Sequence, residues 1–157
     1  MDVRIWTLVE SKGELVRLDD NTPELRLRRA EHYDGALVVQ VKDRPLIDET
    51  TVCDIDWFWG SLWRDTKEFA NGSDVVTWLP DIPYELAFTH LTEGNARISF
   101  SGRGTTVQRF CGARELVEAI TAEADSYYRN MIRLAKKQQR IWVDTLDDIR
   151  AFPGHPR

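Results

Sequence analysis

The stretch that decides the fold runs from Ala113 to Gln139 and reads ARELVEAITAEADSYYRNMIRLAKKQQ. Its apolar residues recur in alternating steps of four and three, and this spacing gathers them on one face of an α-helix. We therefore predict a long amphipathic C-terminal helix over this stretch, with its apolar face against the rest of the protein. The residues on that face are Ala113, Val117, Ile120, Ala124, Tyr127, Met131 and Leu134.

A second amphipathic helix is expected in the middle of the chain, from about Ile55 to the Asn71-Gly72 pair that would end it. Thr51 and Asp54 have the Ser/Thr-x-x-acid spacing that satisfies free backbone amides at a helix start. Asp144 is expected to cap a short final helix. The apolar face of the mid-chain helix consists of Ile55, Phe58, Trp59, Leu62, Phe69 and Ala70.

Two groups of strands lie before and after the mid-chain helix. The first group is expected to form two hairpins, with turns at Ser11 to Gly13 and at Asp34-Gly35. The second group is expected to form a three-stranded meander, preceded by an edge or crossing strand that prolines follow. The expected strands span 3–9, 15–18, 25–28 and 36–41 in the first group, and 75–79, 84–91, 96–101 and 105–111 in the second.

The order of these elements predicts the fold class α+β. Antiparallel sheets from the two strand groups would pack against one mid-chain helix and a long C-terminal helix. The strict alternation of strands and helices that is typical of a parallel sheet does not occur. The length of 157 residues fits a single domain, 1–157, with a polar tail from about residue 153 in which His155 would fray.

Composition narrows the class of protein. Hydrophobic residues make up 42% and charged residues 30% of the chain, which is typical of a folded globule. The sequence shows neither an apolar run of membrane-spanning length nor an export signal, so we expect a cytoplasmic protein with no membrane contact. The cysteines Cys53 and Cys111 are then expected to be reduced. The net charge of −5 opposes nonspecific binding to nucleic acid and favours a partner with a basic surface.

No motif in the sequence is typical of a catalytic or cofactor site. The glycine-rich, nucleophile-elbow and zinc-protease patterns that mark common enzyme classes are absent. Cys53, Asp54 and Asp56 stand within four residues, but the two carboxylates diverge by about 200° around a helix, too far for one ion. The helix dipole already explains acids at a helix start. We therefore expect no catalytic residue, no metal and no cofactor.

Trp57 is the first candidate for a binding residue. On the mid-chain helix it projects about 160° away from the apolar face, toward Arg64 and Glu68. An exposed Trp beside polar groups is typical of an interface anchor. The alternative is that Trp57 packs under the long C-terminal helix or a loop, since Trp is usually well buried.

The meander supplies further candidates. His90 has the same parity as the apolar residues of its strand, so it is expected to face the core and to bond a backbone group. Glu85 and Arg97 belong to the opposite, outward parity, where an ordinary solvated sheet face also accounts for them. An alternative hypothesis is a cleft near Glu85, His90 and Arg97, joined by Asp56, that binds a small ligand or acts as an enzyme.

Five cations on the long helix form the last candidate. Their spacing places them within about 100° of one another, opposite the apolar face. This basic ridge is a hypothetical contact for RNA, DNA or an acidic protein surface, but the acidity of the chain favours a solvated face, and we do not expect nucleic acid as a partner. The ridge residues are Arg129, Arg133, Lys136, Lys137 and Arg140.

Taken as a whole, the sequence favours a small intracellular protein of bacterial type that binds another protein without catalysis. An inhibitor or immunity protein that covers a basic active site is an example of this class. The prediction depends on the acidic balance, the absence of catalytic motifs and the position of Trp57. The cleft near His90 and the basic ridge from Arg129 to Arg140 remain as alternatives.

Overall fold

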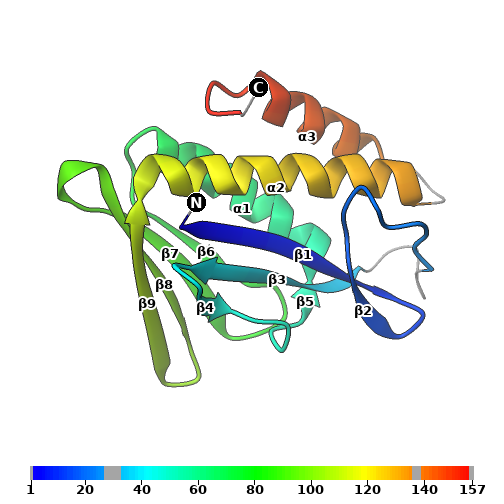
Figure 1. Cartoon of the computed structure of the whole chain (residues 1–157), viewed down its shortest axis with the longest axis horizontal. Coiled ribbons are helices and arrows are strands. Elements are labelled where there is room, and N and C mark those ends of the chain that lie inside the picture. Colours follow the sequence, from blue (N-terminus) through cyan, green and yellow to red (C-terminus); the bar gives the residue numbers. More distant parts are fainter. Residues whose placement is uncertain (1, 27–32, 136–138, 156–157) are drawn as a thin grey trace.

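The computed structural model describes residues 2–26, 33–135 and 139–155, and within these ranges it has two antiparallel sheets and three α-helices (Figure 1). The first sheet consists of β1 (Val3–Ser11), β2 (Glu14–Arg17), β3 (Asp34–Val41), β4 (Arg44–Ile47) and β5 (Cys53–Asp54). In this sheet β2, β1, β3 and β4 follow one another, and β5 pairs with β3 beside this path. The first hairpin, β1 to β2, is therefore where the sequence predicted it.

The second sheet is a four-stranded meander. It consists of β6 (Val75–Trp78), β7 (Tyr84–His90), β8 (Asn95–Gly102) and β9 (Thr105–Gly112), which follow one another in sequence order. A short 3-10 turn, η1 (Thr92–Gly94), joins β7 to β8. The expected meander and the strand before it are confirmed, and β6 forms an edge of the sheet.

Three helices complete the fold: α1 (Ile55–Ala70), α2 (Ala113–Leu134) and α3 (Arg140–Ala151). Helix α1 packs on β3 and β6, and α2 packs along β1 and α1. Helix α3 lies on the side of α2 that faces away from the sheets (Figure 1). No helix in the described part of the chain is long and apolar enough to cross a membrane.

Both sheets and both long helices share one apolar interior. Leu37 of the first sheet, Phe88 of the second, Leu62 of α1 and Ile120 of α2 surround the same small space at its centre. All four side chains are almost completely buried. Because burial of apolar surface is the main favourable contribution to folding, this shared interior holds the two sheets together. The predicted α+β class, with sheets from two strand groups packed on a mid-chain and a C-terminal helix, is confirmed.

The second predicted hairpin is wrong. Asp34 and Gly35 belong to β3 and pair with β5, so they do not form a turn. Gly35 also pairs with Val9 of β1, at a place where the backbone comes very close. A Cβ atom at this position would lie 2.3 Å from the carbonyl oxygen of Leu8, so only glycine fits without a backbone shift.

The hairpin that does form joins β3 to β4. Its turn residues Lys42 and Asp43 both have positive φ, 52° and 64°, which non-glycine residues rarely adopt. The strand predicted at 25–28 is not present at Leu25 and Arg26, and its other residues lie outside the described residues. Strand β3 therefore pairs with β1 on one side and with β4 and β5 on the other.

The predicted C-terminal helix is too long. Helix α2 ends at Leu134, where its apolar face also ends, and Ala135 has an extended backbone with ψ of 133°. Residues 136–138 lie outside the described residues, and α3 begins at Arg140. Asp144 therefore lies inside α3 and does not cap it.

Asp54, rather than Thr51, caps α1. Its side chain accepts a hydrogen bond from the backbone N–H of Trp57, with a distance of 3.2 Å. We expect Asp54→Ala to lower the free energy of unfolding by about 1 kcal/mol in urea denaturation, because the N–H loses its partner. Asp54→Ser keeps an acceptor and should cost clearly less. Equal stability of the alanine variant and the wild type would contradict a contribution from this cap.

Candidate functional site

A groove between α1 and α3 brings together residues that are far apart in the sequence. Its volume is about 630 Å³. Trp57 and Arg64 line it from α1, and Ile141 and Asp144 line it from α3. Trp142, which is almost fully buried, anchors α3 beside them. The groove therefore contains two of the three residues that the sequence singled out around Trp57.

Two large apolar side chains at this groove stand in solvent. Trp57 is 70% exposed and Ile141 is 61% exposed. Trp57 points away from the buried face of α1, as its helical position predicts, so it is not packed beneath another described segment. Glu68 is exposed on the same helix but does not line the groove. A pair of exposed apolar side chains beside a groove is typical of a surface that contacts another molecule.

Asp56 of α1 lines the groove, and its carboxylate connects α1 to both α2 and α3. Its Oδ1 accepts hydrogen bonds from the hydroxyl of Tyr127 in α2 and from the indole Nε1 of Trp142 in α3, both at 2.8 Å. Burial raises the pKa of Asp56, and the two hydrogen bonds oppose that rise. Because the carboxylate is already bonded to two rings, it acts as a structural acceptor that sets α3 against α1.

A second set of polar contacts lies further along the groove. Asp148 of α3 accepts a hydrogen bond from Trp63 Nε1 at 2.8 Å and pairs with Lys67 Nζ at 2.7 Å. The hydrogen bonds from Lys67 and Trp63 hold the pKa of Asp148 below its ordinary value. Both walls are therefore fixed by specific bonds, and the groove presents its apolar rim on a rigid support.

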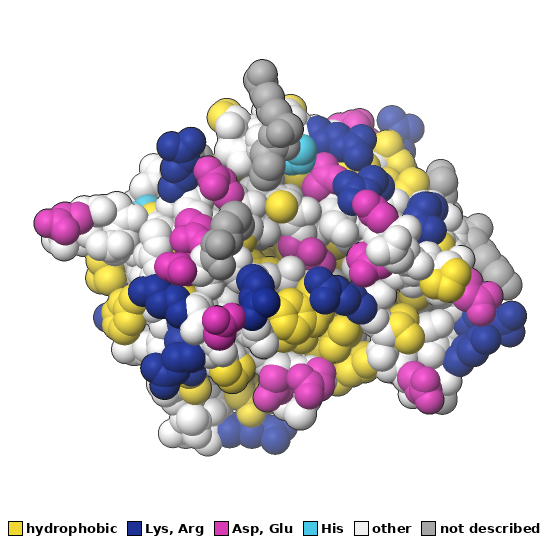
Figure 2. Space-filling model, in the orientation of Figure 1, with side chains coloured by type: hydrophobic (Ala, Val, Ile, Leu, Met, Phe, Trp, Pro, Cys, Tyr) yellow, Lys and Arg dark blue, Asp and Glu magenta, His cyan; other side chains and the backbone are white. Residues whose placement is uncertain are grey.

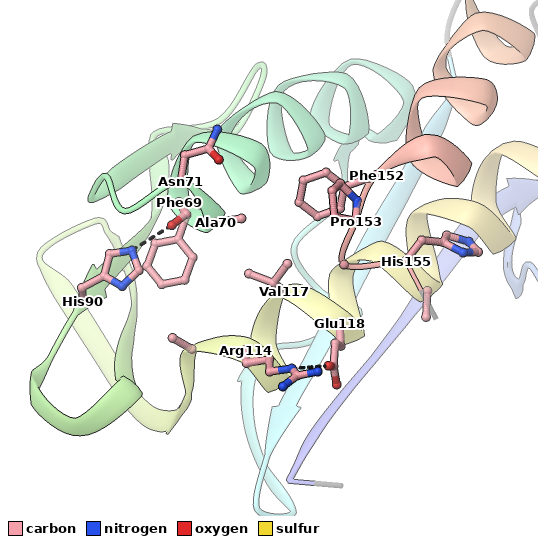
Figure 3. A pocket seen from close by; sticks show the side chains of 13 residues that line it. Phe69, Ala70, Asn71, His90, Arg114, Val117, Glu118, Phe152, Pro153 and His155 are labelled. Atoms are coloured by element: carbon pink, nitrogen blue, oxygen red, sulfur yellow. Dashed lines mark hydrogen bonds and ion pairs between the residues drawn. The ribbon is translucent and has the colours of Figure 1, made fainter. Parts of the chain in front are cut away.

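A larger cleft of about 1010 Å³ lies between the end of α1, the start of α2 and the C-terminal segment (Figure 3). His90 lies on one side, where its Nε2 donates to the carbonyl oxygen of Phe69 at 2.8 Å and its ring stacks on Phe69 with centroids 4.0 Å apart. This is the backbone-bonded arrangement expected for His90. Arg114 on α2 is bonded to Glu118 at 3.0 Å. These polar groups are thus occupied by the chain itself.

His155 lies at the far end of this cleft and is fixed to α2. Its Nε2 donates to the carboxylate of Asp125 at 2.8 Å, and its side chain is 22% exposed. Asp125 also accepts hydrogen bonds from Arg129 and Arg150. Burial raises the pKa of Asp125, but the bonds from His155 and Arg150 and the nearby arginine charges outweigh it, so the pKa lies below its ordinary value. The expected fraying of His155 is therefore wrong.

The four residues of the cleft hypothesis do not converge. Glu85 and Arg97 lie on the outer face of the second sheet, and His90 lies on the inner side of β7. Asp56 lies at the groove between α1 and α3. The hypothesis of a shared cleft for a small ligand or an enzyme therefore lacks a common site.

The basic ridge is not a continuous free surface. Arg129 forms an ion pair with Asp20 at 2.8 Å, and Arg133 donates to the backbone oxygens of Asp19 and Thr22. Arg140 lies at the start of α3 rather than on α2. Lys136 and Lys137 lie outside the described residues. The segment after β2 therefore forms intramolecular bonds with two of the predicted contact residues, Arg129 and Arg133. The spacing of residues along one helix does not reveal such bonds.

The cysteine and aspartate cluster at the start of α1 serves the fold. Burial raises the pKa of the Cys53 thiol to about 12, and burial raises that of Cys111 to about 11, so both are inert thiols at neutral pH. Asp54 caps α1 and Asp56 holds the two rings. Across the ranges that the structure describes, no group of three or more His, Cys, Asp or Glu residues is placed to hold a metal ion.

The outer face of the first sheet is a further apolar area. Figure 2 shows the side of the molecule on which β1 lies in front, with hydrophobic side chains in its middle and charged side chains around them. On this face Trp6 pairs with Val38, and Leu8 pairs with Ala36. The guanidinium of Arg17 lies over the Trp6 ring, 5.2 Å from its centroid, and shields it from solvent. This area is therefore less available than the rim at Trp57.

Sequence reasoning identified Trp57 but missed Ile141. Ile141 is adjacent to Trp142, and on α3 the two side chains point to different sides, one to solvent and one to the core. Placing the helix start at Arg140 would have shown this difference.

Comparisons of the chain with protein-family models, with curated proteins and with solved structures found no match.

Proposed function

We propose that this protein is a noncatalytic protein-binding domain of the inhibitor or immunity type, and that it engages its partner at the groove between α1 and α3. The observation that carries the proposal is the exposure of Trp57, 70%, beside the exposed Ile141 on a rigid groove. Trp is among the residues that contribute most to protein–protein binding when a partner buries it.

The rigid support of the groove favours binding. The bonds from Tyr127 and Trp142 to Asp56, and from Trp63 and Lys67 to Asp148, fix both helices before any partner arrives. A preformed surface loses less conformational entropy on association than a mobile one. Burial of the apolar rim by a partner therefore contributes to binding free energy without the entropy cost of ordering the two helices.

The acidity of the whole chain favours a partner with a basic surface. Lys67 is paired with Asp148, and Arg64 with Asp65 at 3.2 Å, so these cations are largely neutralised within the chain. Asp144 at the groove is exposed and pairs with Arg140 at 3.8 Å, so the acids and bases around the groove are paired alike, while the chain as a whole has a net charge of −5. Opposite charges speed the encounter and orient the partner. We infer that the partner presents a cationic group next to an apolar one.

Capture from native lysate with variants of two exposed apolar residues tests the proposal. The full chain, Trp57→Ala and Leu91→Ala are immobilised beside an acidic protein of matched charge. Leu91 is the control because it is 38% exposed and does not line the groove. We expect a protein that the wild type and Leu91→Ala retain and Trp57→Ala loses. With that protein purified, Trp57→Ala should weaken binding at least tenfold, about 1.4 kcal/mol or more.

Two outcomes of this experiment count against the proposal. One is that the wild type enriches no protein over the charge-matched control. The other is that Trp57→Ala retains the same partner with the same affinity as the wild type. Circular dichroism of each variant shows whether the fold is intact, since a change in a side chain that is mostly in solvent should leave stability within about 0.5 kcal/mol.

A further inference from the structure

The outer face of the second sheet is an open surface with an unusual arrangement of residues. Its centre is the directly paired Ala87 and Ser99, which are small. The large apolar side chains Trp78 and Phe110 stand on the two outermost strands, β6 and β9, and are 66% and 51% exposed. The described helices pack on the inner face of this sheet and on the first sheet. The outer face therefore offers two aromatic corners, and between them lie the small pair Ala87 and Ser99 and the exposed Val76, which pairs with Ala87.

Each aromatic side chain on this face has one charged residue beside it. Among the outward positions of β6 to β9, the charged residues are Glu85 and Arg97. Glu85 is paired with Trp78, and Arg97 is paired with Phe110. One corner therefore combines an aromatic ring with an acid, and the opposite corner combines an aromatic ring with a base.

Glu85 and Arg97 cannot satisfy one another within one chain. They lie on opposite sides of the Ala87–Ser99 pair, four ladder positions apart, which is about 13 Å along the strands. The Nε of Arg97 is buried without a hydrogen-bond partner among the described residues, and its Nη2 lies 3.5 Å from Thr89 Oγ1. The buried Nε is out of reach, but a carboxylate from outside the chain would bond the terminal nitrogens of this guanidinium, of which Nη2 has only the 3.5 Å contact with Thr89.

We propose that this face binds the same face of a second copy of the chain. In a two-fold symmetric interface, if one residue contacts a second, the second contacts the first in return. A two-fold axis that lies in the interface, passes between Ala87 and Ser99 and runs at right angles to the line joining the two corners brings the Trp78–Glu85 corner of each copy onto the Phe110–Arg97 corner of the other. Two ion pairs and two aromatic contacts then form, and the small central residues let the sheets approach.

The size of the face sets the strength of this association. Four strands about 4.8 Å apart and six ladder positions give an area of about 400 Å² on each copy. This is about half of the roughly 800 Å² that a stable, specific interface buries on each partner, so the association is weak. The dimer is therefore reversible and forms as the protein concentration rises.

Sedimentation velocity of the full chain, from micromolar to millimolar concentration, tests the dimer. The average sedimentation coefficient of the wild type should rise with concentration. Glu85→Arg or Arg97→Glu alone places like charges opposite one another and should weaken the dimer at least tenfold. The double variant Glu85→Arg/Arg97→Glu restores opposite charges and should restore the dimer. Trp57→Ala should dimerise like the wild type, which separates this result from partner binding at the groove.

Cross-linking supplies a second test in case a charge variant fails to fold. Ser99 lies close to the axis, so two copies of Ser99→Cys should be joined by a short bismaleimide, while Thr50→Cys on an exposed loop should not. The native cysteines are buried and do not compete. A wild type that stays monomeric throughout, single variants that dimerise normally, a folded double variant that stays monomeric, or Ser99→Cys without cross-links would each overturn the proposal. Capture of a different protein on this face would point to another occupant and would also overturn it.

Discussion

Replacing Asp56 with alanine is expected to lower the free energy of unfolding by about 3 kcal/mol, because the change leaves two buried donors without a partner. The hydroxyl of Tyr127 and the indole Nε1 of Trp142 both donate to Asp56 Oδ1 at 2.8 Å, and both rings are almost completely buried. Each unsatisfied donor costs about 1 to 3 kcal/mol. Removal of a carboxylate whose pKa burial raises offsets part of this cost.

Asp56→Asn is the matched control. The side-chain oxygen of asparagine can still accept hydrogen bonds from both rings. The free energy of unfolding of Asp56→Asn should therefore lie within about 1 kcal/mol of the wild type. Urea denaturation followed by Trp fluorescence measures both variants, and near-ultraviolet circular dichroism reports whether the Trp142 ring has loosened. If alanine and asparagine were equally stable at position 56, the bonds to the two rings would not be what fixes α3 against α1.

Glu123→Gln is expected to make the protein more stable than the wild type at alkaline pH but not at acidic pH. Oε1 of Glu123 accepts from the backbone N–H and from the hydroxyl of Thr7, both at 3.0 Å. The Thr7 hydroxyl in turn accepts from Trp59 Nε1 at 3.2 Å. Burial raises the pKa of Glu123 from 4.5 to about 7, while the bonds from Thr7 and the charge of Arg17 oppose the rise and Asp19 adds to it.

The direction of this pH dependence follows from proton binding to Glu123. Between the ordinary pKa of 4.5 and the folded value of about 7, the folded protein holds a proton at Glu123 that the unfolded chain has released. The contribution of Glu123 to stability is therefore greatest at low pH, declines as pH rises through this window, and is level above it. Glutamine keeps an acceptor for Thr7 and has no proton to lose.

Denaturation of both proteins at several pH values measures the effect. The stability of Glu123→Gln minus that of the wild type should be near zero at about pH 4 and reach about 2 kcal/mol at about pH 8, a value reduced for the partial exposure of Glu123. The other titrating groups are common to both proteins and cancel in this difference. A difference that does not change with pH would mean that Glu123 ionises normally in the folded protein.

The elements that the sequence predicted correctly are those with a strong local period. The apolar face of α2 and the alternation in β7 to β9 follow directly from residue spacing, since one face of each element must be buried. The turn between β3 and β4 lacks such a signal. Lys42 and Asp43 adopt positive φ without glycine, and this depends on the pairing of the surrounding strands. The tight approach of Gly35 to β1 is equally a property of tertiary structure.

The candidate site likewise combines residues that local spacing predicted with contacts that depend on the tertiary structure. Trp57 was found from its angle to the apolar face of α1, which is a local property. Its neighbour Ile141 was missed because the start of α3 was placed at Asp144. The bonds that fix Arg129 to Asp20, and His155 to Asp125, join segments distant in the sequence, so no spacing rule indicates them. Long-range pairing therefore decides which predicted binding residues are actually available.

The most direct test of the central claim is to map the partner on the folded chain by NMR. The isotopically labelled full chain is titrated with the purified protein that the wild type retains, and shifts of the backbone amides are followed. Shifts should concentrate at the start of α1 and on α3, around Trp57 and Ile141, and be small on both sheets. Shifts confined to the sheets or to the cleft at His90, with α1 and α3 unchanged, would contradict the assignment of the groove as the binding surface.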